Sequence, residues 1–179
     1  DEVKSLAPFL SEAALMRYRV YVEVEYLIAL RKLPPADQTV LRHLHQHFSE
    51  RDAEQVKIIE LETKHDVKAI EYFIKRKLSH TKLKKQLEFV HFGLTSEDIN
   101  NLAYSLMLRD ALRQVYMPAL HQLIKILKQQ SRRYAGYALL SLTHGQPATP
   151  TTLGKELNVY TLRFQRQYDR LRQIKLLGK

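Results

Sequence analysis

Apolar residues near the start of the chain recur at three- and four-residue steps, which is the spacing of one face of an α-helix. These positions are Leu15, Tyr18, Val22, Tyr26, Ala29 and Leu33. Ser11 is a suitable N-cap, and Pro34 and Pro35 cannot continue a helix. The pattern therefore predicts a helix over residues 11–33.

The same periodicity predicts further helices along the chain. A second is expected over residues 37–61, and a third begins near residue 63 and fades at Lys75-Arg76-Lys77. Residues 96–134 are helical again, and Pro118 should kink or break that run. A last helix is expected over residues 151–177, with apolar positions near the heptad spacing of a bundle or coiled coil.

Glycine and proline interrupt this pattern mainly between residues 139 and 150, which we expect to be irregular. The whole chain of 179 residues has only 5 Gly and 6 Pro, which favours long helices over a many-stranded sheet. The sequence therefore predicts an all-α fold. The apolar face of the last helix still needs a partner, so an oligomer or a fragment of a larger protein is expected.

Composition excludes several classes of protein. The chain has no Cys, so it can form neither disulfides nor thiolate metal sites. No apolar run approaches the roughly 20 residues that span a bilayer, and the N-terminus lacks the apolar core of a signal peptide. The net charge of +10 attracts anions, which leaves nucleic acid and a small polyanionic metabolite both open.

Three segments carry candidate chemistry, and the first is Thr63-Lys64-His65-Asp66-Val67-Lys68. Thr63 and Asp66 have the spacing of a capping box, which needs no function. His65 is left unexplained by that interpretation. It would lie in the first turn of a helix, where backbone N–H groups attract anions and Lys64 and Lys68 add donors.

The second segment is Gly93-Leu94-Thr95-Ser96-Glu97-Asp98-Ile99-Asn100-Asn101. Thr95 and Asp98 again match a helix cap. The hydroxyl groups of Thr95 and Ser96 could also hold a carboxylate or phosphate at the start of the helix.

The third segment is Thr143-His144-Gly145-Gln146-Pro147-Ala148-Thr149-Pro150. His144 lies outside any periodic apolar face, although a histidine in a surface loop remains an ordinary explanation. Gly145 allows the backbone to approach a ligand closely. An imidazole exchanges protons near neutral pH, so His144 is our candidate for a catalytic acid.

Two other features have simpler explanations. His43, His45 and His47 alternate, and two of them have the spacing of zinc ligands, but no third ligand or catalytic Glu is near in the sequence. We therefore expect no metal site. The basic stretch of residues 75–85 lacks the interleaved aromatic residues and motifs of nucleic-acid binding, so a solvated charged face is expected.

Taken together and in this order, the three segments resemble the superfamily of fumarase, aspartase, argininosuccinate lyase and adenylosuccinate lyase. The amino-acid sequence of residues 63–73, 88–101 and 140–150 most resembles that of the adenylosuccinate lyases of the bacterial type. The resemblance implies an N-terminal helical domain over residues 1–94. It also implies that residues 95–179 begin the central bundle of long helices, which is incomplete here.

The resemblance also implies an activity in purine and AMP biosynthesis. These enzymes cleave adenylosuccinate to AMP and fumarate, and a succinylated aminoimidazole carboxamide ribotide likewise, by β-elimination without a cofactor. His144 matches the general acid and His65 a second histidine that orients the substrate. The positions that match substrate contacts are Lys64, Asp66, Lys68, Thr95, Ser96, Thr143 and Gln146. A cytoplasmic homotetramer with shared active sites is implied, without nucleic acid or membrane as partner.

Parts of the family pattern have no match in the chain. The family's base is a Ser in a mobile loop with a Met-Pro-x-Lys-x-Asn continuation, and Met117-Pro118 does not match it. An Arg-Tyr pair that holds phosphate would fall before Asp1. We therefore expect the 179 residues alone to be inactive. Another lyase of the superfamily, or a basic helical binding module, are the alternatives.

Overall fold

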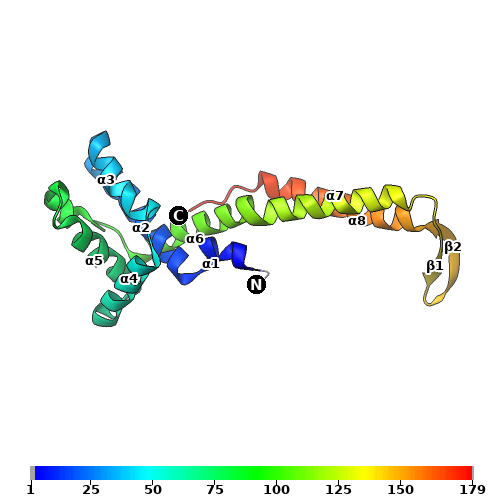
Figure 1. Cartoon of the computed structure of the whole chain (residues 1–179), viewed down its shortest axis with the longest axis horizontal. Coiled ribbons are helices and arrows are strands. Elements are labelled where there is room, and N and C mark those ends of the chain that lie inside the picture. The colour runs from blue at the N-terminus through cyan, green and yellow to red at the C-terminus, as the bar shows by residue number, and fades with distance from the viewer. Residues whose placement is uncertain (1–2, 179) are drawn as a thin grey trace. The chain divides into compact units, whose positions relative to one another are not determined.

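The computed structural model describes residues 3–178 and is mainly helical (Figure 1). These residues form two compact units, one of residues 3–111 with 176–178 and one of residues 112–175. The predicted all-α class is confirmed, with one small hairpin as the exception. The predicted domain boundary after residue 94 stays a prediction about the larger assembly.

The first unit is built on α2, which packs against α6 and α3, while α4 packs against α5. Its helices are α1 (Ala7–Leu10), α2 (Glu12–Arg31), α3 (Pro35–Gln46), α4 (Glu50–Thr63), α5 (Asp66–Leu78) and α6 (Ser96–Ala111), with 3-10 helices at Lys4–Leu6 and Lys82–Phe89. Its largest hydrophobic cluster joins the apolar faces of α2, α4 and α5, with Leu27, Ile59 and Phe73 all almost fully buried.

The start of α2 agrees with the sequence, and two later boundaries do not. Ser11 caps α2 by accepting a hydrogen bond from the backbone N–H of Ala14 at 3.1 Å. The single helix predicted over residues 37–61 is wrong, because a capping box formed by Ser49 and Asp52 starts a new helix there. The cap predicted at Thr63 is also wrong, since Thr63 ends α4 and His65 caps α5.

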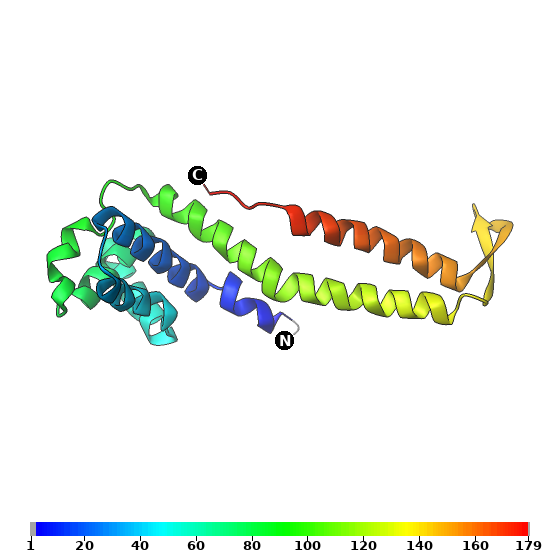
Figure 2. The ribbon, with the colours of Figure 1, turned by 90° about the horizontal axis from the view of Figure 1, so that it is seen from above.

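The second unit consists of α7 (Met117–Arg133) and α8 (Leu153–Gln173), which lie side by side and are joined by a hairpin (Figure 2). A π-helical turn, Leu112–Tyr116, precedes Pro118, which lies in the first turn of α7. The predicted interruption therefore takes the form of a change in helix type. Gly154 lies against the end of α7, where an added Cβ would be 2.4 Å from the carbonyl oxygen of Ser131.

The irregular structure predicted for residues 139–150 is wrong. Strands β1 (Ala138–Thr143) and β2 (Gln146–Thr152) pair antiparallel, with an irregularity in register between Leu140 and Leu142. Both prolines lie on β2 of a two-stranded ribbon, where each strand has one open edge that needs no N–H donor. The last helix also ends four residues earlier than predicted, at Gln173.

Candidate functional site

The first candidate segment forms the N-terminus of α5, and His65 is its N-cap. The His65 ring Nδ1 accepts a hydrogen bond from the backbone N–H of Lys68 at 3.2 Å. Because a backbone N–H can only donate, a neutral His65 ring carries its proton on Nε2. Lys64 turns the chain into this cap through a left-handed backbone conformation, with φ of 55°.

Asp66, the first residue of α5, has both carboxylate oxygens engaged. Oδ1 accepts from the backbone N–H of Val67 at 2.8 Å, and Oδ2 accepts from Nη2 of Arg19 at 2.6 Å. Burial alone would raise the pKa of Asp66, but the Val67 N–H and the Arg19 guanidinium outweigh it, and the pKa lies below its usual value.

The second candidate segment forms the N-terminus of α6. The Asp98 carboxylate accepts from the backbone N–H of Thr95 at 2.8 Å and from its hydroxyl at 2.9 Å. Ser96 begins the helix, and its Oγ lies 3.4 Å from Nε2 of His65. The structure therefore brings the first two predicted segments together, with an imidazole and a hydroxyl between two helix N-termini.

Lys68 and Glu71 form a charged cluster on α5. The carboxylate of Glu71 is buried, with Nζ of Lys68 at 2.8 Å from one oxygen and Nζ of Lys75 at 2.9 Å from the other. The hydrogen bond to Glu71 raises the pKa of Lys68. Almost half of the Lys68 side chain is exposed, while that of Glu71 is almost fully buried.

Glu23 and His91 form a largely buried pair that the sequence did not indicate. Nδ1 of His91 is 2.5 Å from Oε1 of Glu23, whose side chain is completely buried. The hydrogen bond to Glu23 raises the pKa of His91 in spite of its partial burial. The left-handed backbone of His91, with φ of 62°, is typical of a turn before Gly93. No local pattern pairs residues 68 positions apart, so only the fold reveals this contact.

The third segment forms the tip of the hairpin in the second unit. Thr143 pairs with Gln146, which leaves His144 and Gly145 as a two-residue turn. Both have positive φ, 51° and 75°, as a type I′ turn requires. His144 is exposed, and Thr143 and Gln146 flank it at the ends of the strands. The predicted site residues thus fall into two groups, one in each unit.

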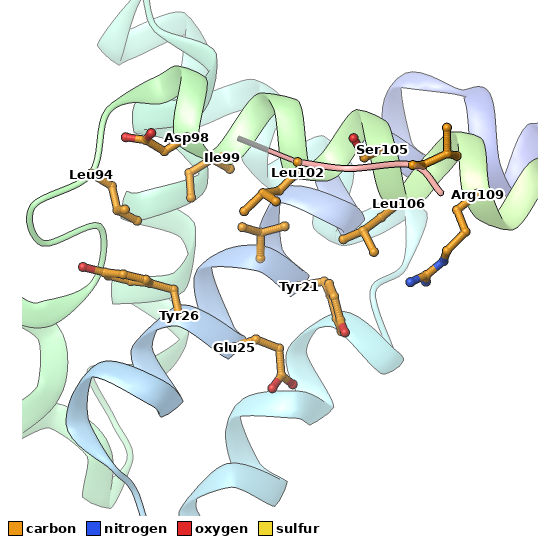
Figure 3. A pocket seen from close by; sticks show the side chains of 13 residues that line it. Tyr21, Glu25, Tyr26, Leu94, Asp98, Ile99, Leu102, Ser105, Leu106 and Arg109 are labelled. Atoms are coloured by element: carbon orange, nitrogen blue, oxygen red, sulfur yellow. The ribbon is translucent and has the colours of Figure 1, made fainter. Parts of the chain in front are cut away.

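An apolar pocket of about 480 Å³ lies in the first unit, between α2 and α6 (Figure 3). Tyr21 and Tyr26 of α2 face Leu102 and Leu106 of α6 across it. Among the residues that the structure describes, none of the predicted site residues lines this pocket. Its apolar lining does not suit a substrate with several negative charges.

Within residues 3–178, no three His, Asp or Glu side chains come close enough together to hold a metal ion. The rings of His43 and His47 do lie near each other, with centroids 4.0 Å apart. In the same residues, every helix is too short or too polar to cross a bilayer.

The fold and these segments define a class of protein: residues 12–177 match the lyase family, and the chain belongs to that family. The resemblance of the three segments is thereby confirmed. The chain is 46% identical over its whole length to the adenylosuccinate lyase of Buchnera aphidicola subsp. Schizaphis graminum, and 43% identical to that of Escherichia coli. It is 44% identical over 96% of its length to the enzyme of Dictyostelium discoideum. The chain spans 40–41% of the length of these relatives.

Solved structures have the same fold at lower identity. A β-carboxy-cis,cis-muconate cycloisomerase from Acinetobacter calcoaceticus superposes with a TM-score of 0.79 at 23% identity, covering 96% of this chain and 40% of its own. A fumarate lyase from Mesorhizobium sp. superposes with a TM-score of 0.77 at 19% identity, covering 94% and 39%. At such identities, the likeness shows the fold alone.

Proposed function

We propose that this chain is the N-terminal portion of an adenylosuccinate lyase. The whole enzyme would release fumarate from adenylosuccinate to leave AMP, and from the succinylated aminoimidazole carboxamide ribotide, in purine biosynthesis. The reaction is a β-elimination without a cofactor. A base removes a proton from the succinyl carbon, and an acid protonates the departing nitrogen. The relatives that carry this name match the chain along its whole length.

The observation that carries the proposal is the meeting of two helix N-termini at His65 and Ser96, whose Nε2 and Oγ lie 3.4 Å apart. Helix N-termini present unpaired N–H groups and positive partial charge to an anion. Lys64 and Lys68 add ammonium groups, and Thr95 adds a hydroxyl. A substrate with a phosphate and two carboxylates suits such a site better than a neutral one does.

His144 is assigned as the general acid. Its place at the tip of a two-residue turn exposes the ring, because the turn holds it outside the ladder of the two strands. Thr143 and Gln146, the residues on either side of the turn, are assigned as substrate contacts.

His65 is assigned an auxiliary role in orienting the substrate. The cap on Lys68 occupies Nδ1, so a neutral ring meets the substrate through a donating Nε2–H. That tautomer can hold a carboxylate or phosphate oxygen, and it cannot accept a proton at Nε2. His65 is therefore not the base of the elimination. The 179 residues by themselves are expected to be inactive, since none of them matches the family's base.

The assembly is proposed to be a cytoplasmic homotetramer whose subunits share each active site. The second unit supports this proposal because α7 and α8 leave large apolar side chains exposed. They are Leu123 and Ile126 on α7, and Tyr160, Leu162 and Phe164 on α8. Burying such side chains against other subunits would stabilise a helix bundle.

The test uses the protein that contains this chain, incubated with adenylosuccinate while AMP and fumarate are measured by chromatography. His144→Gln should lower kcat by orders of magnitude with a modest change in KM, because the acid acts on the leaving nitrogen. His80→Gln, an exposed histidine outside the segments, is the matched control. Unchanged turnover in His144→Gln would remove His144 from the acid role.

The same preparation separates the alternatives. Release of fumarate from argininosuccinate, without cleavage of adenylosuccinate, would favour another lyase of the superfamily. Tight binding of duplex DNA with a steep dependence on salt, and no lyase activity, would favour a basic binding module. Either result would overturn the proposal.

A further inference from the structure

Arg19 forms hydrogen bonds to both helices whose N-termini make up the candidate site. It lies on α2, and its side chain is only 6% exposed. Nη2 donates to Oδ2 of Asp66 at 2.6 Å, and Nε donates to Oδ1 of Asn100 at 2.9 Å. Asp66 is the first residue of α5, and Asn100 lies in the second turn of α6. One buried guanidinium therefore contacts both helices that carry the predicted anion-binding residues.

The geometry of this contact depends on arginine. A guanidinium is planar and presents several N–H donors in fixed directions, whereas an ammonium is a point charge that rotates. Arg19 uses Nη2 for one helix and Nε for the other, so the angle between the bonds constrains the helices relative to each other. A charge buried this deeply is held in place, because moving away from Asp66 would leave it unpaired.

The bonded residues are direct neighbours of the functional groups. Asp66 follows His65, whose Nδ1 caps α5, and Asn100 lies one turn after Ser96 on α6. His65 Nε2 and Ser96 Oγ lie 3.4 Å apart. They belong to the ends of two helices that are both bonded to the buried Arg19. A shift of either helix along Arg19 changes that separation directly.

We propose that Arg19 is a positioning residue of the substrate site, acting through Asp66 and Asn100 on His65 and Ser96. The inference rests on the proposed function for its substrate, adenylosuccinate. It assigns Asp66 the role of partner to Arg19, with both carboxylate oxygens used within the protein. Arg19 itself does not touch the substrate.

The first experiment measures the coupling between Arg19 and Ser96 in the protein that contains this chain. Arg19→Met should lower kcat/KM for adenylosuccinate at least tenfold. The change should be mainly in KM, because the binding groups His65 and Ser96 lose their spacing, whereas the proposed acid, His144, is not attached to Arg19. Arg19→Lys keeps the charge and loses the second directed hydrogen bond. Its kcat/KM should therefore lie between the values of the wild type and Arg19→Met. Arg31→Met, an exposed arginine on the same helix, is the matched control.

The double variant distinguishes positioning from a general loss of stability. In the wild-type background Ser96→Ala should lower kcat/KM, whereas in the Arg19→Met background it should add less than a twofold loss. Equal losses in both backgrounds would show that Arg19 does not act through Ser96 and would overturn the proposal. If Arg19→Met does not fold, the same comparison with Arg19→Lys, for which partial coupling is expected, decides.

Hydrogen exchange provides a test that does not need activity. In Arg19→Lys, backbone N–H groups at residues 66–68 and 96–98 should exchange at least tenfold faster, while those at the start of α4 should not change. Unchanged exchange at both N-termini would overturn the proposal. A wild-type protein that leaves adenylosuccinate intact would instead refute the proposed function, and the exchange result would still decide the role of Arg19.

Discussion

The substitution Glu23→Gln is expected to destabilise the protein, and more so in mildly acidic than in alkaline solution. It replaces a fully buried carboxylate by an amide of nearly the same shape. The amide oxygen can still accept a hydrogen bond from Nδ1 of His91, so the change removes mainly the charge. Packing around Glu23 is preserved, but the amide N–H2 takes the place of Oε2, which is buried without a hydrogen-bond partner among the described residues. That part of the cost does not change with pH, so the pH-dependent part of the loss measures the pair of Glu23 and His91.

The expected magnitude follows from the geometry of that pair. A hydrogen bond to a charged group contributes about 1.5–3 kcal/mol. The contact of 2.5 Å within a closed environment belongs to the upper part of this range. Of the other charged groups near His91, Glu71 also raises its pKa and Lys68 lowers it. Because the amide oxygen keeps a neutral hydrogen bond of about 1 kcal/mol, we expect a net loss of about 2 kcal/mol where His91 is protonated.

The direction of the pH dependence follows from the raised pKa of His91 in the folded protein. Such a group contributes stability that is fully present below its unfolded pKa of about 6.5. The contribution is lost as the pH rises through the higher folded pKa. Since Glu23→Gln removes the cause of that shift, its cost should be largest near about pH 6 and should shrink towards about pH 9.

Urea unfolding followed by circular dichroism at both pH values measures this difference. Glu25→Gln is the control on the same helix, because its partner Arg42 is partly exposed and such a pair contributes only about 0–1 kcal/mol. His91→Asn, which tolerates a left-handed backbone and does not titrate, should abolish the pH dependence. An equal cost of Glu23→Gln at both pH values would refute the reasoning.

Two further substitutions test the packing of each unit. Gly154→Ala should cost about 1–3 kcal/mol, because its Cβ would meet the backbone of Ser131, whereas Gly136→Ala, with open space around its Cβ, should change little. Urea unfolding checks both, and an equal effect would contradict the close contact of α8 with α7. Phe73→Ala should cost about 3–5 kcal/mol, because the ring is buried in the largest cluster of the first unit. The exposed neighbour Tyr72→Ala should cost much less in the same assay, and a loss for Phe73→Ala as small as that of an exposed side chain would contradict its place in the core.

Much of the fold depends on contacts between residues three or four positions apart, which the sequence displays. The N-cap at Ser11 and the helix that follows it were predicted correctly for this reason. The capping box at Ser49 was also visible as Ser-x-x-Asp, although continuous apolar periodicity across it led to one predicted helix in place of two. At Thr63 two cap positions competed, and the side chain of His65 took the place of the hydroxyl.

The hairpin was missed because its signal is weak. His144-Gly145 is not among the commonest pairs at a type I′ turn, and prolines at positions 147 and 150 argue against a strand. A two-stranded ribbon with exposed edges tolerates both prolines. Identifying His144 as a candidate did not depend on that structure, because the argument used its place outside any apolar face.

The sequence by itself thus determined the helical class, most helix boundaries and the three segments of the candidate site, because each is encoded by neighbouring residues. Only the tertiary structure decided which of these segments meet. Arg19 and Asp66 are 47 positions apart, and Glu23 and His91 are 68 apart. Burial explains the difference. From its sequence neighbours alone, a charged residue on α2 is expected to be solvent-exposed. Arg19 becomes a buried partner only when α5 and α6 pack against α2.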